Sequence, residues 1–182
     1  MTLTLKLFPT IVQVIELEHL VEPILAVVDG ITAGQHALIG GASSWGNQQN
    51  LLDHPGLVTV RAELAQWTSS FASNYLGLQP VTITNSWFNV QGVGDQVLEH
   101  RHAMSVVSAA FYLDCAEGSS TLDFHDPVES QRQFEYNHIS RLRHSLEACR
   151  GNLVLFPSWL AHSTRANTSS RRVVASWNSS YY

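Results

Sequence analysis

The second half of the chain limits the possible folds most strongly, because it is a series of short strand-like segments separated by turn residues. These segments are rich in β-branched and aromatic residues, and apolar and polar side chains alternate in the first of them, PVTITNSWFNV. The five segments are residues 80–90, 104–114, 120–126, 151–159 and 171–178. Short strands with turns between them predict an antiparallel β core, and a jelly roll is the closed form that suits such a core.

The first half of the chain is predicted to be more helical. Apolar residues recur at helical spacing in residues 18–31 and again in residues 57–78. The repeat in the second segment gives one apolar face, made of Leu64, Trp67, Phe71 and Tyr75. Helices followed by many short strands favour a mainly β protein with N-terminal helices (α+β), in which the helices pack on one side of the β core.

The length of 182 residues suits one domain, and 45% hydrophobic with only 14% charged residues is typical of a compact globular protein. Residues 3–17 are predicted to form a strand that is interrupted at Pro9. We expect a single domain over residues 1–182, with helical support mainly in 18–78 and the β core mainly in 80–178.

Charge and cysteine content argue against several classes of protein. The net charge is −5 and Lys6 is the only lysine, so nucleic acid is an unexpected partner. Cys115 and Cys149 are the only cysteines and form no Cys-x-x-Cys motif, which argues against a disulfide scaffold and a zinc ribbon. The N-terminus lacks the pattern of a signal peptide, and no apolar run is long enough to span a membrane. We therefore predict a cytoplasmic protein without a membrane partner.

A pair of histidines, His100 and His102, precedes the strand-like segment that begins at residue 104. In extended backbone, side chains two residues apart point to the same face, so two imidazoles can take adjacent positions on one metal ion. His162 follows the apolar run NLVLF and a turn at Pro157, and it is the candidate for a third ligand. Three ligands on one side of an ion leave positions open for substrate and oxygen, as in non-haem iron sites. The spacing alone also allows three unrelated histidines.

An arginine at the start of the last strand favours a functional site. Arg172 follows His162 by ten residues, and a buried arginine in a β core needs an anionic partner. The guanidinium group binds a carboxylate through two parallel hydrogen bonds, and no acidic residue nearby in sequence is an obvious partner. A bound dicarboxylate would supply the missing charge. Arg171 is the competing choice, because strand alternation alone does not say which face is inside.

These motifs together resemble the iron(II)- and 2-oxoglutarate-dependent oxygenases, and more narrowly a group of small 2OG-Fe(II) oxygenases of that superfamily. The resemblance runs through nearly the whole chain and rests on LFPTIVQVIEL (7–17), SWFNV (86–90), HRHAMSVVSAAFYL (100–113), GNLVLFPSWLAHS (151–163) and RRVVASWN (171–178). It implies a double-stranded β-helix (jelly-roll) core, an Fe(II) cofactor, and 2-oxoglutarate and O2 as cosubstrates. The implied reaction is hydroxylation of a substrate with release of succinate and CO2.

The resemblance also implies roles for individual residues. His100 and His162 match the iron-binding histidines of the superfamily, and His102 stands where an Asp or Glu is usual. This departure gives a neutral set of three histidines. A three-histidine metalloprotein of the cupin type, acting as a dioxygenase or isomerase without 2-oxoglutarate, is therefore an alternative. A jelly roll that binds a ligand without turnover is another.

The remaining implied roles concern the cosubstrate and the substrate. Arg172 matches the residue that pairs with the distal carboxylate of 2-oxoglutarate. Tyr112 matches a tyrosine that hydrogen-bonds the same carboxylate, and Asn89 matches a polar residue that contacts the cosubstrate. No segment identifies the substrate. We expect substrate contacts from residues 40–56, a turn-rich loop, and from residues 129–149, a polar and arginine-rich segment that suits either a loop or a helix.

Overall fold

The computed structural model describes residues 3, 9–47, 49–128 and 143–181. The predicted helical segments are confirmed. The first contains a 3-10 turn, Glu18–Leu20, followed by helix α1, Val21–Val28, and the second contains helix α2, Val58–Leu76. Helix α2 ends at Gly77, whose left-handed φ of 65° stops the helix without the strain that a side chain would add. Neither helix is long and apolar enough to cross a lipid bilayer.

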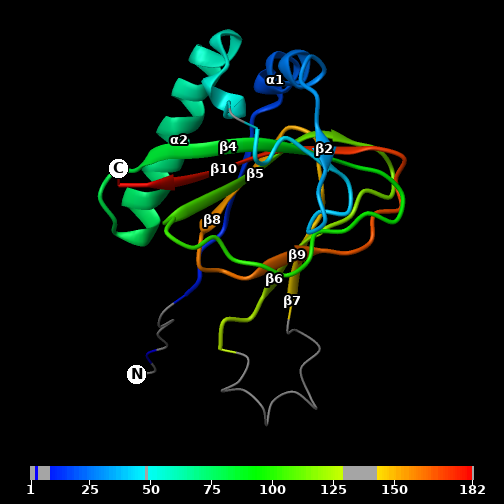
Figure 1. Cartoon of the computed structure of the whole chain (residues 1–182). Helices are drawn as coiled ribbons and strands as arrows, with labels where there is room; N and C mark the ends of the chain where they lie inside the picture. Colours follow the sequence, from blue (N-terminus) through cyan, green and yellow to red (C-terminus); the bar gives the residue numbers. More distant parts are fainter. Residues whose placement is uncertain (1–2, 4–8, 48, 129–142, 182) are drawn as a thin grey trace, which may run out of the picture.

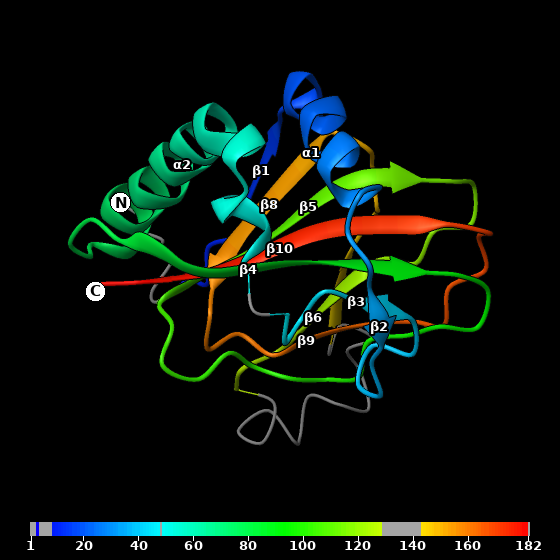
Figure 2. The same cartoon turned by 45° about the horizontal axis from the view of Figure 1, so that its top comes forward.

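The strands form two antiparallel sheets (Figure 1). The large sheet has the order β1-β8-β5-β10-β4-β3-β2, and the small sheet has the order β7-β6-β9. The strands are β1 (Gln13–Glu16), β2 (Gly34–Gln35), β3 (Ala42–Ser43), β4 (Thr82–Gln91), β5 (Val107–Cys115), β6 (Leu122–His125), β7 (Arg143–Leu146), β8 (Asn152–Pro157), β9 (His162–Thr164) and β10 (Arg172–Ser180). Helices α1 and α2 cover one face of the large sheet, and the small sheet lies on its other side (Figures 1 and 2). The mainly β fold with helices on one side is therefore confirmed.

The alternation of side chains along the central strands divides the apolar residues into two cores. On β10, Val173, Ala175 and Trp177 belong to the core beneath the helices, whereas Val174 belongs to the core on the opposite face. Strands β5 and β8 divide their apolar residues in the same way. Both faces of these strands are buried, which is why their sequences read as nearly continuous apolar runs.

Helix α2 is attached to the large sheet by a buried polar contact. The indole Nε1–H of Trp177 donates to Thr68 Oγ1 over 3.1 Å, and Thr68 Oγ1 donates to the carbonyl of Leu64 over 2.7 Å. Leu64 and Phe71 are buried as predicted. Tyr75, which the helical repeat placed on the same face, is exposed in the last turn of the helix.

Several sequence expectations need correction. Residues 40–56 are less irregular than predicted, because they contain strand β3 and the 3-10 turns Leu51–Asp53 and Pro55–Leu57. Strand β5 begins only at Val107 and not at residue 104, and His100 and His102 lie in the segment before it. The expectations for residues 4–8 and 129–142 lie outside the described residues. The rest of the predicted 129–149 segment, residues 143–149, contains strand β7. Cys115 and Cys149 are free thiols.

Candidate active site

Backbone pairing places His100 beside His162. The segment before β5 runs antiparallel to β9, and His100 and His162 exchange both backbone hydrogen bonds, at 3.0 and 3.1 Å. The pairing continues at Val97 and Thr164, where the Thr164 amide donates to the Val97 carbonyl and the Val97 amide donates to Thr164 Oγ1. Residues that face each other in an antiparallel pair direct their side chains to the same side. The imidazoles of His100 and His162 therefore meet, although 62 positions separate them in the sequence.

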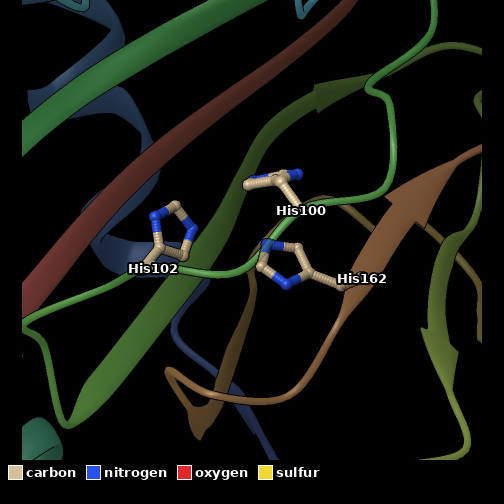
Figure 3. Close-up of side chains that lie close together, drawn as sticks. All are labelled: His100, His102 and His162. Atoms are coloured by element: carbon tan, nitrogen blue, oxygen red, sulfur yellow. The ribbon is translucent and has the colours of Figure 1, made fainter.

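His102 joins them through a separate anchor. Its backbone amide donates to the carbonyl of Ser158 over 3.1 Å, which draws the chain beyond His100 across the start of the β8–β9 turn. The ring centroids lie 4.2 Å apart for His100 and His162, 4.9 Å for His100 and His102, and 5.2 Å for His102 and His162. One nitrogen from each ring lies within 4.8 Å of the others, and the three rings turn toward a common centre (Figure 3). Within the described part of the chain, this is the only group of three side chains that could hold a metal ion.

Two of the histidines have the tautomer that a metal ligand requires. The Nδ1 of His100 lies 2.8 Å from the carbonyl of Leu98, and the Nδ1 of His162 lies 2.9 Å from the carbonyl of Leu160. A carbonyl oxygen only accepts, so each Nδ1 carries the proton and each Nε2 keeps a free lone pair. Such contacts fix the orientation of the ring and raise the basicity of the ligating nitrogen.

Burial keeps the three imidazoles neutral. It lowers the pKa of His100, and it lowers the pKa of His102 to about 4, with a further contribution from the neighbouring His100. The pKa of His162 falls to about 3, again mainly through burial. Neutral imidazole is the form that binds metal, so the site needs no deprotonation at neutral pH.

The histidines open into a cavity of about 310 Å³. Its wall also contains Asn89 and Arg172 among the predicted residues, and it is otherwise mostly apolar. The indoles of Trp45 and Trp87 pack edge to face with ring centroids 4.4 Å apart, and Trp87 lies 5.8 Å from the His102 ring. A mostly apolar pocket with a few convergent polar groups is the usual form of a small-molecule site.

The structure separates the two candidate arginines. Arg172 is 3% exposed and lines the cavity, whereas Arg171 lies on the other side of the strand and pairs with Asp29 and Asp114. Nη1 of Arg172 donates to the side-chain oxygen of Gln91, but Nε has no hydrogen-bond partner. No carboxylate among the described residues forms an ion pair with Arg172, so its charge faces the cavity without a counterion from this part of the chain.

Tyr112 and Asn89 differ in how they relate to the cavity. The Tyr112 ring lies beneath Arg172, with its centroid 5.2 Å from Cζ, and it is not part of the cavity wall. Its buried hydroxyl has no well-aligned hydrogen-bond partner among the described residues, and the Arg172 guanidinium is the charged group that acts on it most strongly. Burial raises the pKa of Tyr112, so the phenol stays protonated and can donate. Asn89 lies in the cavity wall and accepts a hydrogen bond from Ser43 Oγ over 2.7 Å.

The sequence analysis missed several residues of the site. Gln91 lies two residues after Asn89 and therefore on the same face of the strand. Alternation along the strand could have identified Gln91 as a candidate. His125 was not among the predicted site residues, yet its ring contacts Glu99 over 3.2 Å and Ser163 over 2.8 Å, the residues adjacent to His100 and His162. Nothing in the local sequence signals that contact, because it depends on how two distant segments pair.

Comparison with known families identifies the family of this chain. The model of the family described as "Putative 2OG-Fe(II) oxygenase" matches residues 85–178, which include the three histidines and Arg172. The chain belongs to this family, and the protein is a 2-oxoglutarate-dependent Fe(II) oxygenase. Its cofactor is Fe(II) and its cosubstrates are 2-oxoglutarate and O2. This assignment favours the oxygenase over the cupin-type and binding-module alternatives.

Solved structures with the same fold include several oxygenases. A prolyl-4-hydroxylase from Pseudomonas putida is 16% identical, with a TM-score of 0.63 over 93% of this chain and 92% of that one. An oxidoreductase of the 2OG-Fe(II) oxygenase family from Burkholderia pseudomallei is 15% identical, with a TM-score of 0.67 over 90% and 79%. HygX from Streptomyces hygroscopicus, with nickel, 2-oxoglutarate and hygromycin B bound, is 12% identical, with a TM-score of 0.62 over 93% and 82%.

At these identities the likeness shows the fold, which is the jelly roll predicted from the sequence. No curated protein matches the chain.

Proposed function

We propose that His100, His102 and His162 bind the Fe(II) of this oxygenase. The donor set supports the assignment, since three neutral imidazoles converge and two of them are held in the ligating tautomer. Three protein ligands leave positions for a cosubstrate and for oxygen. The third histidine replaces the usual carboxylate, so the protein contributes no negative charge to the metal.

Arg172 is the proposed anchor for the distal carboxylate of 2-oxoglutarate. The observation that carries this proposal is a guanidinium that is 3% exposed, lines the same cavity as the histidines and has an unpartnered Nε. A buried charge of this kind is costly unless an anion pairs with it. The Tyr112 hydroxyl beside it is a second buried donor without a partner, and a carboxylate has enough lone pairs to satisfy both. Asn89 is the proposed polar contact on the neighbouring strand.

The proposed reaction is hydroxylation of a C–H bond in the substrate. When bound together, Fe(II) and 2-oxoglutarate supply the chemistry that converts O2 and the keto acid into succinate, CO2 and one oxygen atom for the substrate. The chain's own residues orient the cosubstrate through Arg172. They also exclude water with the apolar wall around Trp45 and Trp87.

The cavity limits the part of the substrate that can enter. A volume of about 310 Å³ is at the lower end of the range for small-molecule sites, and 2-oxoglutarate must occupy part of it. Exposed side chains of Leu38, Trp45 and Leu98 belong to its wall. We infer that a small, uncharged apolar group of the substrate reaches the metal. The single-domain organisation and the cytoplasmic location stay predictions.

Titration of 2-oxoglutarate into the anaerobic Fe(II)-loaded protein tests the cosubstrate assignment. Chelation of the metal by the keto acid gives a weak visible charge-transfer band, which we expect in the wild type and in the control Arg171→Ala. Arg172→Ala should need far more 2-oxoglutarate to develop the band. A wild type that shows no band at saturating 2-oxoglutarate would contradict the proposal, as would equal titration curves for the two variants.

A further inference from the structure

His102 is held differently from the other two histidines. The Nδ1 atoms of His100 and His162 donate to backbone carbonyls, whereas the Nδ1 of His102 lies 3.4 Å from the side-chain amide nitrogen of Asn178. Figure 3 shows one ring nitrogen of His102 turned toward the other two histidines and the second turned away. Since Nδ1 contacts Asn178 on β10, the nitrogen that faces the centre is Nε2.

With the Asn178 amide in this orientation, His102 has the tautomer that cannot bind a metal through Nε2. An amide nitrogen donates, so the Nδ1 of His102 must accept, and the proton of the neutral ring then lies on Nε2. A protonated Nε2 has no lone pair for an ion. His102 can therefore become a ligand through Nε2 only if its proton moves to Nδ1 and finds an acceptor there.

Asn178 can supply that acceptor by turning over. Its Oδ1 accepts a hydrogen bond from Ser108 Oγ over 2.7 Å, and Ser108 Oγ lies 2.8 Å from Ser158 Oγ. A half-turn of the amide exchanges Oδ1 and Nδ2, so that Oδ1 accepts from the Nδ1–H of His102 while Nδ2 donates to Ser108 Oγ. The Ser108 hydroxyl then donates to Ser158, because a hydroxyl can reverse its direction.

The network is built into the protein interior. Asn178, Ser108 and Ser158 are all at most 3% exposed, so no bulk water competes for their hydrogen bonds. The carbonyl of Ser158 also accepts from the backbone amide of His102, so the same residue anchors both the ring's network and its backbone. Both orientations of the amide give Ser108 and His102 a hydrogen-bond partner.

We propose that Asn178 is a positioning residue that sets the tautomer of His102, and that metal binding turns its amide so that Oδ1 accepts from the His102 Nδ1–H. This inference rests on the proposed metal centre. It gives the third histidine a neutral amide as its outer partner, where metal-bound histidines often have a carboxylate or a backbone carbonyl. Backbone carbonyls fix the tautomers of His100 and His162, whereas a side chain fixes the tautomer of His102. His102 is also the position at which this chain departs from the usual carboxylate.

Co(II) binding to three variants tests the proposal without turnover. Asn178→Leu removes the acceptor at similar volume and should weaken Co(II) binding about 10- to 100-fold and change the visible ligand-field spectrum. Asn178→Asp keeps an acceptor that cannot donate, so its affinity should equal or exceed that of the wild type. Ser179→Ala is the matched control, since Ser179 is the next residue on β10, is fully buried and has an Oγ without a partner.

A second measurement uses the wild type and does not depend on the folding of any variant. Long-range ¹H–¹⁵N correlation spectra of the Zn(II)-loaded protein should show the His102 proton on Nδ1. A proton on Nε2 in the loaded protein would overturn the inference, and so would Co(II) affinities for Asn178→Leu and Asn178→Asp that both equal the wild-type value. If the wild type binds Co(II) but the Asn178 variants do not differ, this inference alone fails. If the wild type binds no Co(II), the metal centre and the inference fail together.

Discussion

His100 and His162 share a local arrangement in which each imidazole donates to the carbonyl two residues earlier in its own chain segment. That contact joins residues only two apart in sequence, so it does not depend on the pairing of the two segments. His102 lacks such a contact and depends on Asn178, whose strand lies far away in sequence. At the scale of single residues, the centre therefore combines two locally oriented ligands with one that is oriented by the fold.

The stability of the metal-free protein should decrease in mild acid. Burial holds the pKa of His102 at about 4 and that of His162 at about 3, while an imidazole in the unfolded chain titrates near 6.5. Between these values the unfolded state binds more protons, so the free energy of unfolding falls as the pH drops below about 6.5. Each proton taken up contributes at most about 1.4 kcal/mol per pH unit. Urea unfolding at several pH values measures the slope, which should be smaller in His102→Gln; an unchanged slope would contradict the account.

Tyr112→Phe should strengthen the fold and weaken cosubstrate binding. The buried hydroxyl has no partner among the described residues, and an unsatisfied buried polar group costs about 1–3 kcal/mol. Its removal should raise the free energy of unfolding in the absence of 2-oxoglutarate. A lost hydrogen bond to a carboxylate should weaken 2-oxoglutarate binding about 10- to 100-fold. Chemical denaturation and calorimetric titration check the two effects; a destabilised variant with wild-type affinity would show that the hydroxyl does not face the cosubstrate.

At the scale of elements, the site depends on the pairing of the segment before β5 with β9. Four hydrogen bonds join Val97 and His100 to Thr164 and His162. The His125 ring adds a side-chain connection, because it contacts Glu99 on one segment and Ser163 on the other. These contacts hold the two ligand-bearing segments together on one side of the histidine pair, and the hydrogen bond from the His102 amide to the Ser158 carbonyl does so on the other.

Replacement of His125 should loosen the metal centre. His125→Ala removes both contacts, so the distance between His100 and His162 becomes less restrained. We expect Co(II) affinity to fall about 10-fold, at the lower end of the effect of residues that support metal ligands. His144→Ala, an exposed histidine on β7, is the control and should bind Co(II) like the wild type. Equal affinities for the two variants would show that the backbone pairing alone holds the centre.

Loss of the contact between α2 and the large sheet should affect stability without affecting the metal. Thr68→Val keeps the shape of the side chain but leaves the buried Nε1–H of Trp177 without an acceptor. We expect the free energy of unfolding to fall by about 1–3 kcal/mol. Denaturant unfolding measures this loss, and Co(II) affinity should stay at the wild-type value, because Trp177 faces the helices and not the cavity.

The sequence predicts these elements better than their contacts. Alternation along β10 already grouped Val173, Ala175 and Trp177, and it could place Arg172 on the opposite face. It could not show which face is inside, since both faces of this strand are buried. That decision depends on which face the helices cover. The roles of His125 and Asn178 were beyond reach for the same reason, because each depends on the pairing of segments that are distant in sequence.

At the scale of the whole molecule, the large sheet serves two purposes. One face carries α1 and α2 (Figure 2) and much of the apolar core. The other face supplies Arg172, Asn89 and part of the cavity wall. The helices therefore stabilise the strands from the face opposite the site. The small sheet and the segment before β5 contribute the histidines. The core residues and the site residues thus lie on opposite faces of the same strands. The motifs that carry the family resemblance therefore also predict the fold class.

The position of the iron in the loaded protein tests the central claim most directly. An anomalous difference map, recorded at the iron absorption edge from crystals grown anaerobically with Fe(II) and 2-oxoglutarate, locates the metal without reference to activity. The account predicts one peak per chain, in contact with Nε2 of His100, His102 and His162, and a cosubstrate carboxylate on the guanidinium of Arg172. A peak elsewhere, or one that His102 does not contact, would contradict it.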